Sequence, residues 1–221
     1  MIPLKDNIPH LRKPYITVTI LIVNVLVFIG QVMLGRNAEQ LINVFGFVPA
    51  RLFTDIGPAL KTIPLFSSLF LHGSLMHLLG NMLFLWVFAD NVEDRLGHLR
   101  FLFFYLTCGV AASMIHALFN LSSRLPTIGA SGAIAGVLGA YFLLYPRAKV
   151  LTLVPIFIFF EVIEIPAFYF LGFWFLFQFV LGLFSLGFDC CSGIALWAHI
   201  GGFLSGILLL FLFLPKRLRQ K

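Results

Sequence analysis

Six long apolar stretches dominate the chain, separated by shorter segments that carry most of the charged residues. A helix needs about 20 mostly apolar residues to cross the hydrocarbon core of a bilayer. The pattern therefore predicts an all-α membrane protein with six spans, at about 15–34, 70–90, 100–120, 128–145, 166–186 and 194–214. The sequence contains no internal repeat and no linker rich in Ser and Gly, so we expect residues 1–221 to form a single domain.

The stretch 150–165 is also apolar, but its residues argue against a seventh span. Pro155 interrupts it, and Glu161 and Glu164 would each bring a carboxylate into the membrane. Such a carboxylate costs at least about 2.5 kcal/mol within a spanning helix. We therefore expect an extended or interfacial hairpin that leads into the fifth span. The two glutamates are expected at a helix end or a water interface rather than as a buried acid–base pair.

The composition excludes several classes of protein. Hydrophobic residues make up 60% of the 221 residues, charged residues only 11%, and the mean hydropathy is +1.01. A soluble domain has about 25% charged residues, and it could not cover so much apolar surface with a polar shell. An ordinary soluble enzyme, a disordered chain and a nucleic-acid binder are therefore excluded. The three cysteines, of which Cys190 and Cys191 are adjacent, are expected to be small apolar fillers.

Lysine and arginine are unevenly divided between the two sides of the predicted bundle. With six spans, both termini lie on one side, and that side carries eleven basic residues: Lys5, Arg12, Lys13, Arg95, Arg100, Arg147, Lys149, Lys216, Arg217, Arg219 and Lys221. The other side carries four: Arg36, Arg51, Lys61 and Arg124. Because basic residues are retained on the cytoplasmic side, both termini are expected there. The connection 35–69 then forms a long external loop that could fold over the membrane surface.

Three segments bring polar groups into the predicted spans at a similar depth. His77 and Asn81 are four residues apart in HLLGN and share one face of the second span. Ser131 lies in GASGAIAGVLGA near the start of the fourth span, and His199 lies in AHIGGFLSG near the start of the sixth. At about 1.5 Å per residue, His77, Ser131 and His199 all fall within roughly the outer third of the membrane. Polar groups inside a membrane are functional candidates by default.

Small residues on the fourth and sixth spans indicate how two of these groups could meet. The residues four and eight places after Ser131 are also small, and Gly202 and Gly206 follow His199 on the sixth span. Such faces let helix backbones approach closely in lipid. Taken alone, the pattern is explained by packing. If the two faces meet, however, Ser131 and His199 can come within hydrogen-bonding distance.

Other polar residues in or near the spans have simpler explanations. Asn24 in the first span and Gln178 in the fifth are single amides, for which hydrogen bonding between helices is the expected role. His116, near the end of the third span, is expected at the membrane interface. His72, at the outer edge of the second span, could be a structural donor to the long first loop.

The polar residues predicted in the outer third of the membrane include the groups that acyl transfer needs. A serine hydroxyl is a weak nucleophile at neutral pH and needs a positioned base, and His199 could take its proton and return it to a leaving amine. Donors aimed at the developing oxyanion contribute about 2.7–4 kcal/mol each. The candidate donors are the Ser131 backbone N–H, the Asn81 amide and the His77 ring. No acid is positioned to orient His199: Asp189, the nearest in sequence, lies about ten residues upstream in a loop. A Ser–His dyad is therefore favoured over a triad.

Together these motifs resemble those of the rhomboid family of intramembrane serine proteases. The similarity runs from about residue 14 to residue 214. It depends on HLLGN (77–81), EDRLG (93–97), GASG (129–132) and AHIGG (198–202). Each motif is weak alone, but all of them in order on the expected spans are very specific.

The resemblance implies a rhomboid-like bundle of six transmembrane helices with a long first external loop and a water-filled cavity that reaches a catalytic dyad. It assigns the nucleophile to Ser131 and the general base to His199. It assigns the oxyanion hole to His77 and Asn81, and it implies that the fifth span and the last loop move to admit substrate. The resemblance also assigns structural roles to Glu93, which would hold the neighbouring loops in place, and to the small residues Gly129, Gly132, Gly202 and Gly206.

The chain departs from this family pattern in two respects. Some rhomboid proteins carry Tyr four residues after the serine, where it stacks on the catalytic histidine. Here that position is Ala135, so the His199 ring needs another partner, such as a phenylalanine or Trp197. Some members also show a Trp-Arg pair in the first loop, and the first loop of this chain contains no Trp.

Two other functions compete with proteolysis. A proteolytically silent membrane protein that binds client helices would be indicated by the loss of Ser131 or His199, and both are present. A small transporter tends to show repeated halves, broken helices and paired intramembrane charges. The sequence shows no repeat and no clear charge pair across the spans.

A protease of this kind implies two partners, the lipid bilayer and membrane-protein substrates with a transmembrane segment. Small or helix-destabilising residues are expected near the cut. Without a zinc-binding cluster or a phosphate loop, we expect no metal, no cofactor and no nucleic acid. The oligomeric state is open, because the small-residue faces also serve packing within one chain. The expected location is multi-pass in a bacterial or archaeal cytoplasmic membrane.

Overall fold

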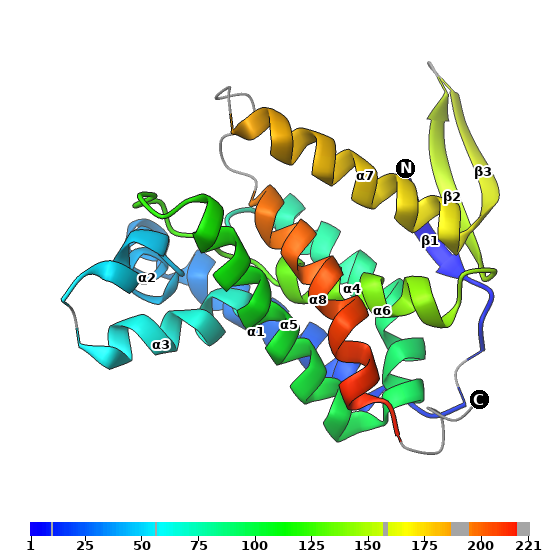
Figure 1. The fold of residues 1–221 in the computed structure, drawn as a ribbon, viewed down its shortest axis with the longest axis horizontal. Helices are drawn as coiled ribbons and strands as arrows, with labels where there is room; N and C mark the ends of the chain where they lie inside the picture. The colour runs from blue at the N-terminus through cyan, green and yellow to red at the C-terminus, as the bar shows by residue number, and fades with distance from the viewer. Residues whose placement is uncertain (10, 56, 157–158, 187–194, 216–221) are drawn as a thin grey trace.

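The computed structural model describes residues 1–9, 11–55, 57–156, 159–186 and 195–215. Within them the chain forms the α-helices α1 (Tyr15–Met33), α2 (Ala38–Phe45), α3 (Pro58–Ser67), α4 (Leu75–Leu96), α5 (His98–Phe119), α6 (Ser131–Leu144), α7 (Ala167–Ser185) and α8 (Leu196–Phe213) (Figure 1). It also forms the 3-10 helices η1 (Gly35–Asn37), η2 (Pro49–Phe53) and η3 (Ser68–Phe70), and the strands β1 (Ile2–Asp6), β2 (Lys149–Ile156) and β3 (Phe159–Pro166). Asp189, Cys190, Cys191 and the four basic residues after Pro215 lie outside the described residues.

The helices of the bundle agree with the predicted spans, with one difference in length. Helices α1, α4, α5, α7 and α8 are each long and apolar enough to cross a membrane. The predicted span 128–145 forms α6, which has only 14 residues. Because α6 is almost wholly buried among the other helices, it does not have to cross the lipid alone. The irregular backbone that precedes it is tolerated at membrane depth where it is buried in protein or lines a wet cavity.

The stretch before α7 forms the predicted hairpin. β2 and β3 pair antiparallel along their length, and β1 pairs with the other edge of β2. Glu161 and Glu164 are both exposed, and Glu164 forms an ion pair with Lys149 at 2.8 Å. The two glutamates are therefore not a buried acid–base pair, as expected, and their place at a water interface stays a prediction. The sequence pattern did not predict β1, because its five residues are too few to show a periodicity.

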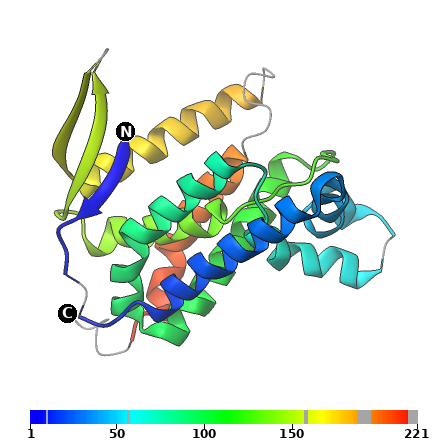
Figure 2. The same ribbon diagram turned by 180° about the vertical axis from the view of Figure 1, so that it is seen from behind.

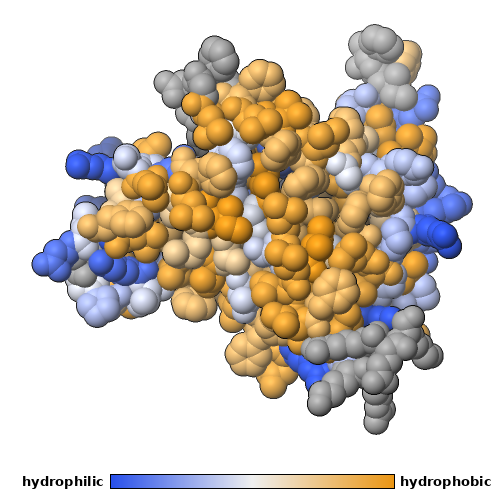
Figure 3. Space-filling model, in the orientation of Figure 1, coloured by the Kyte–Doolittle hydropathy of each residue, from blue (hydrophilic) through white to orange (hydrophobic). Residues whose placement is uncertain are grey.

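Hydrophobic side chains form a broad belt over the face shown in Figure 3, and hydrophilic residues gather at its two ends. Helices α2 and α3 lie at one end of the bundle, and the sheet lies at the other (Figure 1). Seen from behind, α1 runs beside α4, and the N-terminus lies at the end that carries the sheet (Figure 2). At the opposite end, an isolated bridge between Phe47 and Thr127 joins the long first loop to the connection between α5 and α6.

Helices α6 and α8 pack with their backbones in direct contact. A Cβ added to Gly202 would overlap the carbonyl oxygen of Gly132, and one added to Gly206 would overlap that of Gly136. Because the obstacles are backbone atoms, no side-chain rotation could relieve them. This is the close approach predicted from the small-residue faces, and it brings Ser131, the first residue of α6, to the first turn of α8.

The buried side chain of Glu93 joins the start of α1 to the end of α4. Its carboxylate accepts hydrogen bonds from the backbone N–H groups of Ile16 (2.9 Å) and Thr17 (2.7 Å), and from the Thr17 hydroxyl (2.7 Å). Nδ1 of His98, at the start of α5, lies 2.5 Å from the same carboxylate. The first N–H groups of a helix have no acceptor within it, and Pro14 provides no side-chain cap for α1. One carboxylate therefore links three helices.

Glu93→Gln should lower the melting temperature of the detergent-solubilised protein. The amide offers one acceptor oxygen instead of two, so at least one buried N–H of α1 loses its partner, at a cost of about 1–3 kcal/mol. The matched control is Glu164→Gln, which removes the same charge from an exposed ion pair that solvent screens strongly. Thermal unfolding followed by circular dichroism checks this, and equal melting temperatures for the two variants would contradict a capping role for Glu93.

Candidate active site

Ser131 and His199 come from different helices and lie within hydrogen-bonding distance. Ser131 is the first residue of α6, and His199 is in the first turn of α8. The Oγ atom of Ser131 is 2.9 Å from Nε2 of His199. The glycine contacts between the two helices make this approach possible, and the juxtaposition predicted from the small-residue faces is confirmed.

The other ring nitrogen of His199 contacts α7. Nδ1 lies 3.0 Å from Oε1 of Gln178. Because an amide oxygen can only accept, Nδ1 carries the ring proton, and Nε2 presents its lone pair to the Ser131 hydroxyl. Hydrogen bonding between helices was predicted for Gln178, but its partner was not. Four residues earlier on α7, the indole of Trp174 lies beside the imidazole, with ring centroids 6.0 Å apart.

Trp197 does not support His199 in the way suggested from the sequence. Its indole stacks on Phe119 at the end of α5, with ring centroids 3.7 Å apart and planes inclined by 8°. Because the Phe119 ring covers this face of the Trp197 indole, that face is not available to His199. Apart from Ser131, the described contacts to the His199 ring come from Gln178 and Trp174 on α7, which take the place of the aromatic partner that Ala135 cannot supply.

His77 and Asn81 lie on one face of α4, next to the turn that leads into α6. The backbone N–H of Gly73 donates to Nδ1 of His77 at 3.4 Å, so a neutral His77 ring carries its proton on Nε2 and can donate from there. Asn81 Nδ2 donates to Nε2 of His72 at 2.9 Å, and its second N–H is available to a ligand. Gly129 packs against both side chains: its φ is +118°, and an added Cβ would lie 2.7 Å from Nε2 of His77. Only glycine fits this turn without displacing the imidazole.

His72 anchors this part of α4 to α1. Its backbone N–H donates to Oε1 of Gln31 at 3.0 Å, and Nε2 of Gln31 donates back to the His72 carbonyl at 3.1 Å. The sequence suggested a contact with the first loop, whereas the described partners of His72 are Gln31 in α1 and Asn81 in α4. These bonds fix the position of the Asn81 amide.

A cavity of about 900 Å³ opens beside these groups, and Ser131, His199, His77 and Asn81 all line it. The sequence did not predict that His116, which is buried, also lines it. The cavity is large enough to hold water or a short extended segment of chain. A carbonyl bound here would meet a nucleophile, a base and two side-chain donors together. Among the described residues, no group of three or more His, Cys, Asp or Glu side chains could hold a metal ion.

Comparison with known proteins agrees with the fold. An apolar helical bundle with five helices long enough to span a membrane defines an integral membrane protein. The family profile described as Rhomboid domain matches residues 60–216. The match covers most of the chain and includes the segments that line the cavity. The chain belongs to the rhomboid family.

Three similar proteins illustrate the relationship. The chain is 31% identical over 156 residues to "Rhomboid protein 1, mitochondrial" of Saccharomyces cerevisiae, covering 66% of this chain and 40% of the yeast protein. It is 38% identical over 111 residues to "Presenilin-associated rhomboid-like protein A, mitochondrial" of Danio rerio, covering 48% of this chain and 29% of that protein. It is 27% identical over 235 residues to "RHOMBOID-like protein 6, mitochondrial" of Arabidopsis thaliana, covering 91% and 69% respectively.

The chain thus spans less than half the length of the yeast and zebrafish proteins. All three relatives are named as mitochondrial. Their names weigh against the bacterial or archaeal membrane expected from the sequence. The distribution of basic residues indicates the orientation of the helices and does not identify the membrane.

Proposed function

We propose that this protein is an intramembrane serine endopeptidase that cleaves the transmembrane segments of other membrane proteins with a Ser131–His199 dyad. The observation that carries this proposal is the 2.9 Å contact between Ser131 Oγ and His199 Nε2 at the wall of a cavity. Membership of the rhomboid family supports it.

In the acylation step, Ser131 Oγ attacks the carbonyl carbon of the scissile peptide while its proton moves to His199 Nε2. A tetrahedral intermediate forms, and its oxyanion accepts hydrogen bonds from the side chains of His77 and Asn81 and from the Ser131 backbone N–H. His199 then gives its proton to the leaving amine, and the carbon–nitrogen bond breaks. The product is an acyl ester on Ser131 and a free amine.

In the deacylation step, water from the cavity attacks the ester carbon and His199 accepts its proton. The second tetrahedral intermediate collapses, the proton returns to Ser131 Oγ, and the carboxylic acid product leaves. Gln178 remains a neutral hydrogen-bond acceptor throughout. It orients the imidazole, and it stabilises the imidazolium less than a carboxylate would because it carries no charge.

The proposed substrates are membrane-spanning segments with small or helix-destabilising residues near the cut. Within a helix, each carbonyl accepts a hydrogen bond and is surrounded by side chains, so Ser131 requires a locally unwound segment. The cavity lies at the end of the bundle away from β1 and the last turn of α8. With the N-terminal segment on the side of the membrane that retains basic residues, cleavage would occur near the other surface.

A fluorophosphonate probe tests whether the serine is activated. The wild-type protein in detergent should become labelled at Ser131, because the phosphorus centre reacts only with a serine whose proton a base removes. Ser131→Ala should abolish labelling. Ser185→Ala is the matched control, because Ser185 also lines the cavity but donates its hydroxyl to the Gly182 carbonyl at 2.7 Å. An unlabelled wild-type protein of normal melting temperature would instead favour a silent protein that binds client helices.

Gln178→Leu should lower kcat for a model substrate helix by about fivefold and leave KM nearly unchanged. The leucine removes the acceptor of the His199 Nδ1 proton, and one lost hydrogen bond corresponds to about 1 kcal/mol. Gln178→Glu restores an acceptor and should recover the rate. Steady-state kinetics in lipid vesicles check this, and a change confined to KM would argue for a substrate-binding role.

A further inference from the structure

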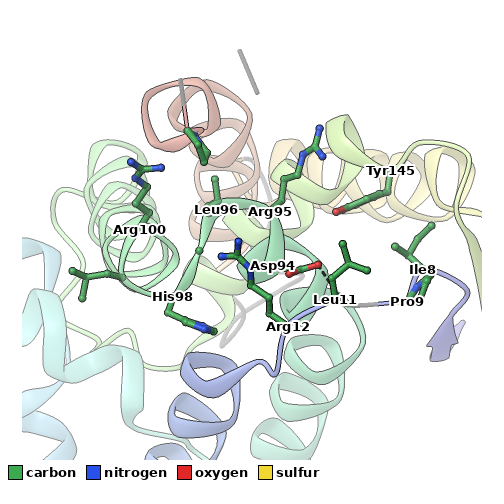
Figure 4. Close-up of a pocket in the computed structure, with 13 residues that line it drawn as sticks. Ile8, Pro9, Leu11, Arg12, Asp94, Arg95, Leu96, His98, Arg100 and Tyr145 are labelled. Carbon is green, nitrogen blue, oxygen red and sulfur yellow. Dashed lines mark hydrogen bonds between the residues drawn. The ribbon is translucent and has the colours of Figure 1, made fainter. Parts of the chain in front are cut away.

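A second cavity, of about 1230 Å³, lies at the opposite end of the bundle from the Ser131 site (Figure 4). The segment before α1, the turn between α4 and α5, and the ends of α6 and α8 line it. Helix α4 connects the two cavities, since His77 is in its first turn and Arg95 in its last. Eighteen residues of helix separate them by about 27 Å, which places the second cavity at the other membrane surface, on the side of the termini.

Three arginines from three different segments surround this cavity. Arg12 precedes α1, Arg95 ends α4 and Arg100 is in the first turn of α5 (Figure 4). All three side chains are exposed. Among the described residues, the ion pairs join other side chains, His98 with Glu93 and Lys149 with Glu164. The three guanidinium groups are therefore available to an external anion.

The remaining polar groups at the cavity leave its charge positive. Asp94 is the one acidic side chain among the lining residues, and its carboxylate already accepts a hydrogen bond from the Leu11 backbone N–H at 2.9 Å. Helix α5 begins at the cavity without a side-chain cap, so the N–H groups of its first turn lack an acceptor within the helix. The partial positive charge at this helix start adds to that of the arginines.

Large apolar side chains lie directly beside the charged groups. Leu11 is 89% exposed and Leu99 is 67% exposed, and both line the cavity. One turn beyond Leu99 on α5, Phe103 is 55% exposed and continues the apolar surface away from the arginines. A purely polar anion would leave these side chains uncovered. A ligand with an anionic head and hydrocarbon chains would satisfy both parts of the surface.

We propose that Arg12, Arg95 and Arg100 bind the phosphate group of an anionic phospholipid, whose acyl chains lie along Leu99 and Phe103. Guanidinium groups suit this role because their planar pairs of donors match phosphate oxygens. Basic pockets between membrane helices on the cytoplasmic or matrix side bind lipid headgroups in this way. The site is independent of proteolysis, because it lies at the far end of α4 from Ser131 and His199.

Lipid titration of delipidated protein in detergent tests the proposal. Phosphatidylglycerol should raise the melting temperature of the wild-type protein in a saturable manner, and phosphatidylcholine at the same concentrations should not. Arg95→Gln combined with Arg100→Gln should raise the half-saturating concentration of phosphatidylglycerol about 30-fold, since each basic side chain at an anionic surface contributes about one factor of five in affinity. Unchanged half-saturation in this variant would overturn the proposal.

The control variant combines Arg36→Gln with Arg124→Gln, which removes the same charge from the other side of the protein. It should bind phosphatidylglycerol like the wild type, and an equal weakening would show undirected attraction and overturn the site. A variant that combines Arg95→Lys with Arg100→Lys keeps the charge, and it replaces the glutamine variant in the test if that variant does not fold. Because lysine lacks the planar donor pair, half-saturation should rise several-fold, and wild-type binding would count against the site.

Glycerol phosphate distinguishes a lipid from a soluble phosphate. At the concentration at which phosphatidylglycerol saturates the shift, glycerol phosphate should leave the melting temperature unchanged, because it does not cover Leu11 and Leu99. An equal shift with glycerol phosphate would assign the cavity to a soluble anion and overturn the lipid assignment.

Discussion

Ser131→Ala should reduce the cleavage of a model substrate helix by about 10⁴-fold or more, to the limit of detection. Alanine lacks the hydroxyl that attacks the carbonyl, and the removal of a catalytic serine from a soluble serine protease costs about 10⁶-fold in kcat. Purified protein in lipid vesicles with a fluorescent substrate helix provides the measurement. The melting temperature should change little, because the described hydrogen bond of the Ser131 side chain goes only to His199.

Ser185→Ala provides the control, since it removes a hydroxyl from the same cavity without touching the dyad. It should cleave at the wild-type rate. Cleavage by Ser131→Ala within tenfold of the wild-type rate would assign the nucleophile elsewhere and contradict the proposed mechanism.

Gly206→Leu should destabilise the bundle by about 3 kcal/mol. A Cβ at this position would overlap the carbonyl group and Cα of Gly136, so α8 would have to move away from α6. The same movement would separate His199 from Ser131, and cleavage should disappear with the folded state. Thermal unfolding in detergent and cleavage in vesicles measure the two effects.

Gly30→Leu is the matched control for this change. Gly30 is also within a spanning helix, but a Cβ there meets nothing within 4 Å. The substitution adds an apolar side chain to an exposed helix surface and replaces a residue of low helix propensity. It should therefore be neutral or slightly stabilising. If Gly30→Leu and Gly206→Leu melted at the same temperature, the contact between α6 and α8 would not explain the loss of stability.

The proximity of Ser131 and His199 could be predicted because close backbone packing requires small residues at the contact, and these are visible in the sequence. Small residues at helical spacing on two spans predict that those spans touch, and the contact at Gly202 and Gly206 agrees. The hairpin before α7 was equally predictable, since proline and two carboxylates are costly in a spanning helix. Both features follow from local residue types and the low polarity of the membrane.

The partner of Gln178 could not be predicted in the same way. A single amide in an apolar helix indicates a hydrogen bond, but the sequence does not state which neighbouring helix faces it. The same limit explains Trp197, which stacks on Phe119 instead of His199, and His116, whose position at the cavity wall was not predicted. The rotation of each helix about its axis depends on contacts with all its neighbours, and the apolar surfaces here offer little periodicity to define it.

The contact between Gln178 and His199 makes one imidazole a reporter of helix position. The acceptor of the Nδ1 proton is on α7, whereas the partner of Nε2 is on α6. Displacement of α7 by more than a hydrogen-bond length would free Nδ1 and leave the contact with Ser131 intact. The tautomer equilibrium of His199 would then shift, and the ¹⁵N chemical shifts of its ring would record it. Selective ¹⁵N-histidine labelling could thus follow the docking of α7 in a lipid bilayer without a label on the helix itself.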